Sequence, residues 1–542
     1  MLTLPLEPTD DRANPFCKDA ASCAQWLGQL QLTNLQLAHS LLLTQINELN
    51  RYPMRGQERL DTLELLRETV GYVQDDYAKK LIAKPLPLNE SELMVFVALV
   101  QLWQAMVLGY QRCLQGYMAG DKQLARHGAL LCQRCLLYSG LEIFEHLRTG
   151  YEFDAKLWHQ LHELYAFAEE HGLHQAEVPD PLSAIQPRSS CLGVYVKSLL
   201  ACYARPAELT RTQLHLLDRW LAQWCNTVTV ERSYTVSKGD ALPLAIDLAS
   251  KRGLQPVKTV THNETMRYLA MVPLSKLLRV KTILLQQGQT PRQANLSDHS
   301  TSNDCIEFLS FLHQCWCEDR NTRATERKPV AQQAQLCYKP ESIYAHLSGR
   351  PFKQPAPETS VGSAARRQIE TFGQVLQDAH NKELLEMGFP LETWHLDNES
   401  IMGARLTRAD TFGGRLGYNQ LIALRPSDAA TFMLGITAWA NVTRAGQLQI
   451  GVRYLQGQAE AVSIKATGVN LTVPDKYVPA FLLHAVPALN TPPSLVVPRD
   501  YFQPNRVVEV LHANLEKQLI KMGFSVEHGL DYERVGFTAV SI

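Results

Sequence analysis

Apolar residues recur at helical spacing through the first two-fifths of the chain. Leu63, Leu66, Val70 and Val73, for example, follow one another at intervals of three and four, which places them on one face of a helix. Helices are predicted in this way over residues 22–50, 59–82, 92–116, 120–149, 155–172 and 190–225. Short polar joins separate them, so we predict an all-helical N-terminal module of antiparallel helices over residues 1–225.

The pattern changes at residue 226, where β-branched residues begin to alternate with other residues. Residues 227–236 and 241–250 show this alternation, and a Lys-Gly-Asp sequence at 238–240, typical of a hairpin turn, joins them. The segment continues with two predicted helices, at residues 265–288 and 303–319. We therefore predict a mixed α/β segment over residues 226–319.

Short strand-like stretches dominate the rest of the chain. The strand candidates are residues 330–338, 393–398, 403–409, 419–426, 430–443 and 448–455. Their close spacing predicts a small antiparallel β-barrel over residues 320–468. It carries an insertion at about 340–392, which includes a mobile Pro-, Gly- and Ser-rich stretch and a helix at 368–388. Residues 469–542 predict a small β C-terminal unit, and the fold class is multidomain α+β.

The composition argues against a nucleic-acid-binding, a secreted and a membrane-spanning protein. Lys and Arg number 53 against 54 Asp and Glu, for a net charge of −1, so we expect no general binding of DNA or RNA. The N-terminus lacks the basic and apolar parts of a signal peptide, and the most apolar stretch, 95–110, is too short and too polar to span a bilayer. Twelve cysteines without a disulfide pattern are typical of the cytoplasm. We expect a cytoplasmic protein with no transmembrane segment.

The sequence shows no pattern that we can assign to a metal or to catalysis. Cys132 and Cys135 lie in an apolar helical stretch without a second ligand pair, which is typical of core thiols. His159 and His162 lie near Glu163, but no third ligand is close in sequence. A P-loop, a nucleophile elbow and a dinucleotide-binding glycine run are all missing. We therefore predict no metal site, no cofactor and no catalytic residues.

Two short polar motifs lie beside the predicted barrel strands. Arg323 and Arg327 are the ends of an RxxxR sequence, directly before the first strand. Asn398, Ser400 and Gly403 form an NxSxxG sequence at the end of another strand. These residues resemble the two motifs of the PilZ family of cyclic di-GMP receptors, and the strand LQIGVRYL is similar to one that PilZ barrels contain.

The resemblance covers about residues 320–460 and implies a PilZ-like antiparallel β-barrel. It implies a cyclic di-GMP site made of Arg323, Arg327, Asn398, Ser400 and Gly403. The chemistry of these residues suits the ligand. A guanidinium can hold a phosphate or the O6/N7 edge of guanine bidentately, and Asn and Ser can pair with base edges. Glycine would let the ligand approach the backbone closely. The two motifs are farther apart than in most members, which the predicted insertion explains.

The resemblance also implies a function. The chain would be a cyclic di-GMP-binding receptor that passes the signal to a protein partner through the helical module. Two alternatives stay open. In the first, the arginines only solvate the end of a helix, the Asn-Glu-Ser sequence is a plain turn, and the barrel is a degenerate scaffold for protein–protein contacts without ligand. In the second, an enzyme site is assembled from residues that the sequence does not connect.

Overall fold

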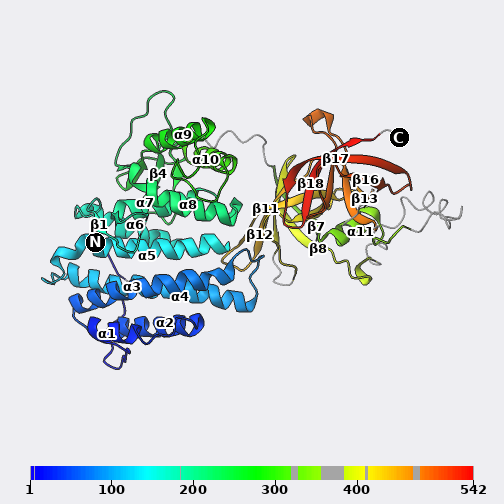
Figure 1. Cartoon of the computed structure of the whole chain (residues 1–542). Coiled ribbons are helices and arrows are strands. Elements are labelled where there is room, and N and C mark those ends of the chain that lie inside the picture. The colour runs from blue at the N-terminus through cyan, green and yellow to red at the C-terminus, as the bar shows by residue number, and fades with distance from the viewer. Residues whose placement is uncertain are drawn as a thin grey trace. The chain divides into compact units, whose positions relative to one another are not determined.

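The chain forms two compact units in the computed structural model (Figure 1). Unit 1 comprises Met1–Lys84 and Leu88–Arg323, and unit 2 comprises Pro85–Pro87 and Ala324–Ile542. The structure describes all residues except 1, 5, 184, 319–327, 356–383, 409–412, 468–475 and 541–542.

The helical module predicted for the N-terminal region is confirmed. Its helices are α1 (Ala20–Leu27), α2 (Leu35–Arg51), α3 (Gly56–Ala78), α4 (Glu90–Met118), α5 (Gly128–Thr149), α6 (Ala155–Glu170), α7 (Cys191–Tyr203) and α8 (Arg211–Trp224). Neighbouring helices pack in sequence order from α2 to α6, and α7 also lies against α5 (Figure 1). The apolar stripe of α3, including Leu63, Leu66 and Val70, is fully buried, as its spacing predicted. Asn89 begins α4 with a reciprocal cap, because its side chain accepts from the Glu92 amide and the Glu92 carboxylate accepts from the Asn89 amide.

Helix α4 is longer than the apolar stretch at 95–110 that the sequence singles out. By length and composition alone, it is the one described helix that could cross a membrane. In the structure it packs against α2, α3 and α5, and Leu99, Leu102 and Met106 are fully buried. A central helix of a folded core passes the same test of length and composition, so this feature is weak evidence for a membrane span.

The mixed segment that follows contains a small sheet and two helices. The elements are β3 (Val230–Glu231), β4 (Leu244–Asp247), β5 (Gln255–Pro256), β6 (Met266–Leu269), α9 (Val272–Gln286) and α10 (Ser302–Cys317). The sheet order is β3-β6-β4-β5. The predicted hairpin between 227–236 and 241–250 is therefore wrong, since β3 and β4 both pair with β6. Residues 231–240 are all exposed, and pairing follows the strands that have apolar side chains to bury, β4 and β6.

Unit 2 begins with the six-stranded antiparallel barrel that the strand spacing predicted. Its strands are β7 (Lys328–Tyr338), β8 (Glu392–Ser400), β9 (Gly403–Arg408), β10 (Leu421–Pro426), β11 (Met433–Val442) and β12 (Leu448–Tyr454). They close in the order β10-β11-β12-β9-β8-β7. The insertion lies between β7 and β8 and contains α11 (Pro340–Ser348). Most of the helix predicted at 368–388 lies outside the described residues.

The C-terminal β unit is a second closed barrel. Its strands are β13 (Ala459–Ala466), β14 (Val478–Leu483), β15 (Ser494–Pro498), β16 (Val507–Leu511), β17 (Lys517–His528) and β18 (Tyr532–Ala539), in the order β13-β14-β15-β18-β17-β16. This barrel begins at β13, before the predicted boundary at residue 469. The alternation of apolar residues is the same on both sides of the short join between β12 and β13, so it does not reveal which barrel a strand enters.

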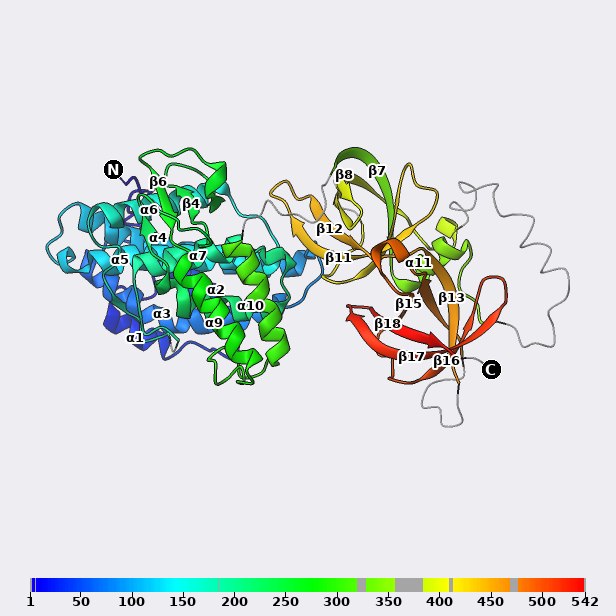
Figure 2. The same ribbon diagram turned by 90° about the horizontal axis from the view of Figure 1, so that it is seen from above.

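The two barrels of unit 2 share an apolar core. Helix α11 packs against β13 and β14 of the second barrel as well as β7 and β10 of the first (Figure 2). Tyr344 of α11 and Ile436 of the first barrel are buried in one cluster with Phe481 and Tyr532 of the second. This shared core fixes the two barrels relative to each other within unit 2.

Candidate binding site on the first barrel

A β-bulge in β8 sets the direction of the NxSxxG side chains. Leu396 is buried inside the barrel and pairs with Leu406, whereas Asn398 pairs with Arg405. Asp397 is therefore an extra residue on β8, and it turns Asn398 to the face opposite Leu396. Asn398 is partly exposed, on the outer face of the barrel beside Arg405.

Directly paired residues continue this outer face across five neighbouring strands. Pro329 of β7 is opposite Asn398, which is opposite Arg405 of β9. Arg405 is opposite Gly451 of β12, and Gly451 is opposite Trp439 of β11. Residues that face each other in an antiparallel pair project from the same side of the sheet. We call these five residues the outer row.

The outer row also places the start of β7 beside the NxSxxG motif. Lys328 is opposite Glu399, so β7 begins between Asn398 and Ser400 of β8. Arg323 and Arg327 lie outside the described residues, but the chain runs directly from Arg327 into Lys328. Strand pairing thus brings Lys328, the residue that follows the RxxxR sequence, beside the NxSxxG motif, although the two lie far apart in the sequence.

Ser400 and Gly403 close the hairpin between β8 and β9. They pair directly, and Ser400 Oγ donates to the Gly403 carbonyl oxygen at 3.2 Å. A Cβ atom at residue 403 would lie 2.1 Å from the carbonyl oxygen of Val452 on β12. From the sequence, Gly403 was predicted to let a ligand approach the backbone closely. In the structure, the group that approaches Gly403 closely is the backbone of β12.

Glu399, the first variable residue of the NxSxxG motif, is partly buried and bonded to β12. Its carboxylate accepts a hydrogen bond from the Tyr454 hydroxyl at 2.5 Å. Burial, together with this carboxylate, raises the pKa of Tyr454, which keeps the hydroxyl protonated. The contact ties β8 to β12 and leaves Asn398 and Ser400 as the residues of the motif that can meet a ligand on the outer face.

Two arginines, Arg405 of the outer row and Arg453 near it on β12, supply positive charge. Arg405 Nε lies 3.1 Å from Asp397 Oδ2, which also accepts a hydrogen bond from Thr407 Oγ1 at 2.8 Å. Arg453 of β12 forms an ion pair with Glu527 of the second barrel. The two arginine side chains are 40% and 42% exposed, so each can offer further N–H groups to an anion.

A second polar cluster of the first barrel gathers around the Glu392 carboxylate. The Glu392 carboxylate accepts hydrogen bonds from Arg408 Nη1 at 2.7 Å, Tyr338 Oη at 3.0 Å and Trp394 Nε1 at 3.1 Å. Burial and the nearby Glu392 raise the pKa of Tyr338 to about 12. Because the donors of this cluster converge on one buried carboxylate, we assign it to the stability of the barrel.

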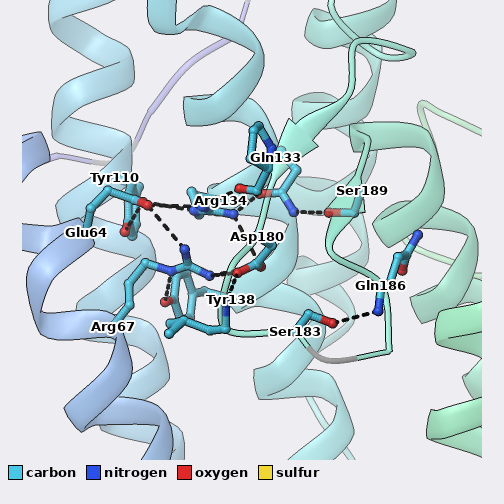
Figure 3. Close-up of polar contacts among 12 residues, drawn as sticks. Glu64, Arg67, Tyr110, Gln133, Arg134, Tyr138, Asp180, Ser183, Gln186 and Ser189 are labelled. Carbon is cyan, nitrogen blue, oxygen red and sulfur yellow. Dashed lines mark hydrogen bonds and ion pairs between the residues drawn. The ribbon is translucent and has the colours of Figure 1, made fainter.

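The helical module contains a buried ionic cluster that the sequence did not reveal (Figure 3). Arg67 donates to both carboxylate oxygens of Asp180, at 2.8 and 2.9 Å, and Arg134 donates to both oxygens of Glu64, at 2.9 and 3.0 Å. Burial opposes the ionisation of Glu64, but Arg134 outweighs it and lowers the pKa. Asp180 directly follows β1 (Val178–Pro179), so the cluster ties this segment to α3 and α5. The cluster contains two carboxylates and two arginines, which neutralise one another, so we assign it to the stability of the helical module.

The cysteine pair and His162, which the sequence singles out, belong to the core, whereas the His159 side chain is 39% exposed. Cys132 and Cys135 are fully buried, and burial raises the pKa of the Cys132 thiol to about 12. His162 lies between the Tyr195 hydroxyl at 2.6 Å and the Arg252 carbonyl oxygen at 2.8 Å, and burial lowers its pKa to about 4. Within the part of the chain that the structure describes, no three His, Cys, Asp or Glu side chains gather as metal ligands would.

Comparison with known proteins adds independent findings. A family model for the N-terminal domain of the cyclic-di-GMP receptor FimW matches residues 21–234, and a model for the FimW C-terminal beta-barrel domain matches residues 465–540. Together they cover more than half of the chain, namely the helical module and the second barrel. Neither model is described as PilZ, so they do not test the PilZ-like interpretation of the first barrel.

A curated relative supports the same family. The chain is 22% identical over 555 residues to the cyclic-di-GMP receptor FimW of Pseudomonas aeruginosa strain PAO1, and the alignment covers 95% of this chain and 90% of the relative. The alignment therefore includes the first barrel as well as the two matched domains. Both domain models and this relative therefore agree that the chain is similar to the cyclic-di-GMP receptor FimW, over its helical module, its second barrel and nearly its whole length.

Proposed function

We propose that this chain is a receptor that binds cyclic di-GMP on the outer row of the first barrel. The observation that carries the proposal is the pairing of Pro329 with Asn398, which places the start of β7 beside the NxSxxG motif. Arg327 and Arg323 precede this start in the sequence. The FimW relative is named a receptor for this ligand, and its similarity to the chain includes the first barrel.

The chemistry of the ligand supports this location. Cyclic di-GMP presents two phosphodiester charges and two guanine bases. We assign Arg323 and Arg327 to the phosphates or to the O6/N7 edge of a guanine, which a guanidinium contacts bidentately. The amide of Asn398 can donate to and accept from a base edge, and the Ser400 hydroxyl can do the same with one group. Gly403 contributes by allowing β9 to pack against β12.

The first barrel is, in this proposal, of the PilZ type. Six antiparallel strands close it, the NxSxxG motif spans the end of β8 and the start of β9, and the RxxxR sequence directly precedes β7, which pairs with β8. In this proposal the receptor binds the nucleotide without changing it. The proposal places the protein in the cytoplasm, and the twelve free cysteines support that location.

We further propose that the helical module passes the signal to a protein partner. Exposed apolar side chains on α4 support this role, since Met94 is 68% and Val97 is 43% exposed. Met94 and Val97 are three residues apart, so their side chains lie on the same face of α4 near its N-terminus. The double substitution Met94→Gln and Val97→Gln makes this surface polar. We expect it to leave the affinity for cyclic di-GMP unchanged and to abolish the cell's response to a rise in cyclic di-GMP.

Isothermal titration of the full chain with cyclic di-GMP tests the proposed function. We expect saturable binding that weakens about tenfold or more in Arg327→Ala and in Asn398→Ala, because each removes hydrogen bonds to a charged or purine group. Arg292→Ala is the matched control, since this arginine is exposed in the mixed segment of unit 1, between α9 and α10. Absence of binding by the unaltered protein, or equal loss in the control, would contradict the proposal.

A further inference from the structure

The far end of the outer row carries an indole on the barrel surface. Trp439 is opposite Gly451, and a Cβ atom at residue 451 would lie 1.9 Å from the indole Nε1 and 2.3 and 2.5 Å from Cε2 and Cδ1. Three atoms of the five-membered ring therefore cover the backbone of Gly451. A register shift between Thr437 and Trp439 turns this side chain outward, as the bulge in β8 does for Asn398.

The indole is supported on one side and open on another. Ile450 and Val452, which flank Gly451, are buried inside the barrel, so Gly451 faces outward. Trp439 is nevertheless only partly buried. Because the backbone already holds this aromatic ring in place, the side chain loses little conformational entropy when a flat ligand stacks on its exposed area.

The arrangement along the row combines an aromatic platform with a cation. Gly451 separates Trp439 from Arg405, and the two side chains start on strands that lie on either side of β12. Twice the usual strand spacing gives a separation of about 10 Å between their Cα atoms. A base that stacks on the indole would thus have its own phosphate near the Arg405 guanidinium, and Asn398 lies on the next strand beyond it.

We infer that Trp439 and Arg405 are ligand-contacting residues, with one guanine of cyclic di-GMP stacked on the indole and a phosphate of the same ligand bound by Arg405. The inference rests on the proposed function and extends the site from β7 and β8 to β9, β12 and β11. Stacking of bases on aromatic side chains is a general means of holding nucleotides. Gly451 leaves room for the indole against the backbone of β12, because any side chain at this position would displace the ring.

Three variants test this extension by isothermal titration with cyclic di-GMP. Trp439→Ala is expected to weaken binding about tenfold or more, since stacking on one aromatic ring commonly contributes at least that factor. Trp439→Phe keeps a flat ring and should stay within about threefold of the unaltered protein. Gly451→Ala should resemble Trp439→Ala. Phe524→Ala is the matched control, because this aromatic side chain is 68% exposed on the second barrel.

Fluorescence supplies a second readout. The chain has eight tryptophans, so the contribution of Trp439 is the difference between the unaltered protein and Trp439→Phe. We expect cyclic di-GMP to quench emission in the former and to have a smaller effect in the latter. Wild-type affinity in Trp439→Ala and in Gly451→Ala, with equal quenching in Trp439→Phe, would overturn this inference while the proposed function stands. A complete lack of binding by the unaltered protein would instead overturn the proposed function.

Discussion

Replacing Gly403 by alanine is expected to loosen the first barrel even when no ligand is present. The added Cβ atom would lie 2.1 Å from the Val452 carbonyl oxygen, 3.1 Å from its carbonyl carbon and 3.2 Å from Arg453 Cα. All three are backbone atoms of β12, which cannot rotate away as a side chain can. Restoring ordinary contact distances requires β9 and β12 to separate locally by about 1 Å, since non-bonded carbon and oxygen atoms do not normally approach below about 3 Å.

The expected cost follows from this displacement. Overpacking of a well-packed site costs about 1–3 kcal/mol. Because 1.36 kcal/mol corresponds to a factor of ten, amides in β9 and β12 should exchange with solvent about 5 to 150 times faster in Gly403→Ala. The amide of Tyr454, which donates to the Met402 carbonyl oxygen at 3.0 Å, lies at the end of this hairpin and should show a large change.

Hydrogen exchange measured on the full chain without ligand is the assay. Gly71→Ala is the matched control, because Gly71 lies in α3 and a Cβ atom there meets nothing within 4 Å. That substitution should slow exchange in α3, since alanine favours a helix over glycine by about 0.5–1 kcal/mol. Unchanged exchange in β9 and β12 of Gly403→Ala would refute the steric explanation and return the glycine to a role in ligand approach.

Three further predictions concern charged groups. Burial raises the pKa of Glu142 to about 7 from 4.5, so the carboxyl binds its proton more tightly when folded and stability falls as pH rises between these values. Glu142→Gln should therefore raise the free energy of unfolding by about 1–3 kcal/mol near pH 8 and change it little near pH 4, as measured by urea denaturation. Glu527→Gln frees Arg453 from its ion pair and should tighten cyclic di-GMP binding in a titration, whereas unchanged or weaker binding would argue against a ligand near Arg453. Arg134→Ala leaves the Glu64 carboxylate without its bidentate partner and should lower the melting temperature, with a cost of about 3–5 kcal/mol.

The fold was predictable where local pattern decides it. The apolar stripe of α3 and the six strands of the first barrel follow from residue spacing within a few residues. The pairing of β3 with β6 was not predictable from the turn sequence at 238–240, because a turn signal specifies a reversal of the chain but not which strands have apolar surface to bury. The start of the second barrel at β13 was not predictable either, because the apolar alternation is the same on both sides of the join between β12 and β13.

The site was only partly visible in the sequence. Asn398 and Ser400 stand out by motif, but their outward direction depends on the bulge at Asp397, which no spacing rule reveals. Trp439 gives no signal in the sequence, since its place beside Arg405 results from β12 pairing with two different strands. Arg323 and Arg327 lie outside the described residues, and their role stays a prediction.

Hydrogen exchange of the full chain with and without cyclic di-GMP tests most directly whether the ligand occupies the outer row. The proposed site predicts that saturating ligand slows exchange at 396–405 and 437–453 and in the segment 320–330 that joins the arginines to β7. Exchange in β15 of the second barrel, Ser494–Pro498, should stay the same and serves as the internal reference. Protection confined to the second barrel or to the helical module, with no change at 396–405, would contradict the account.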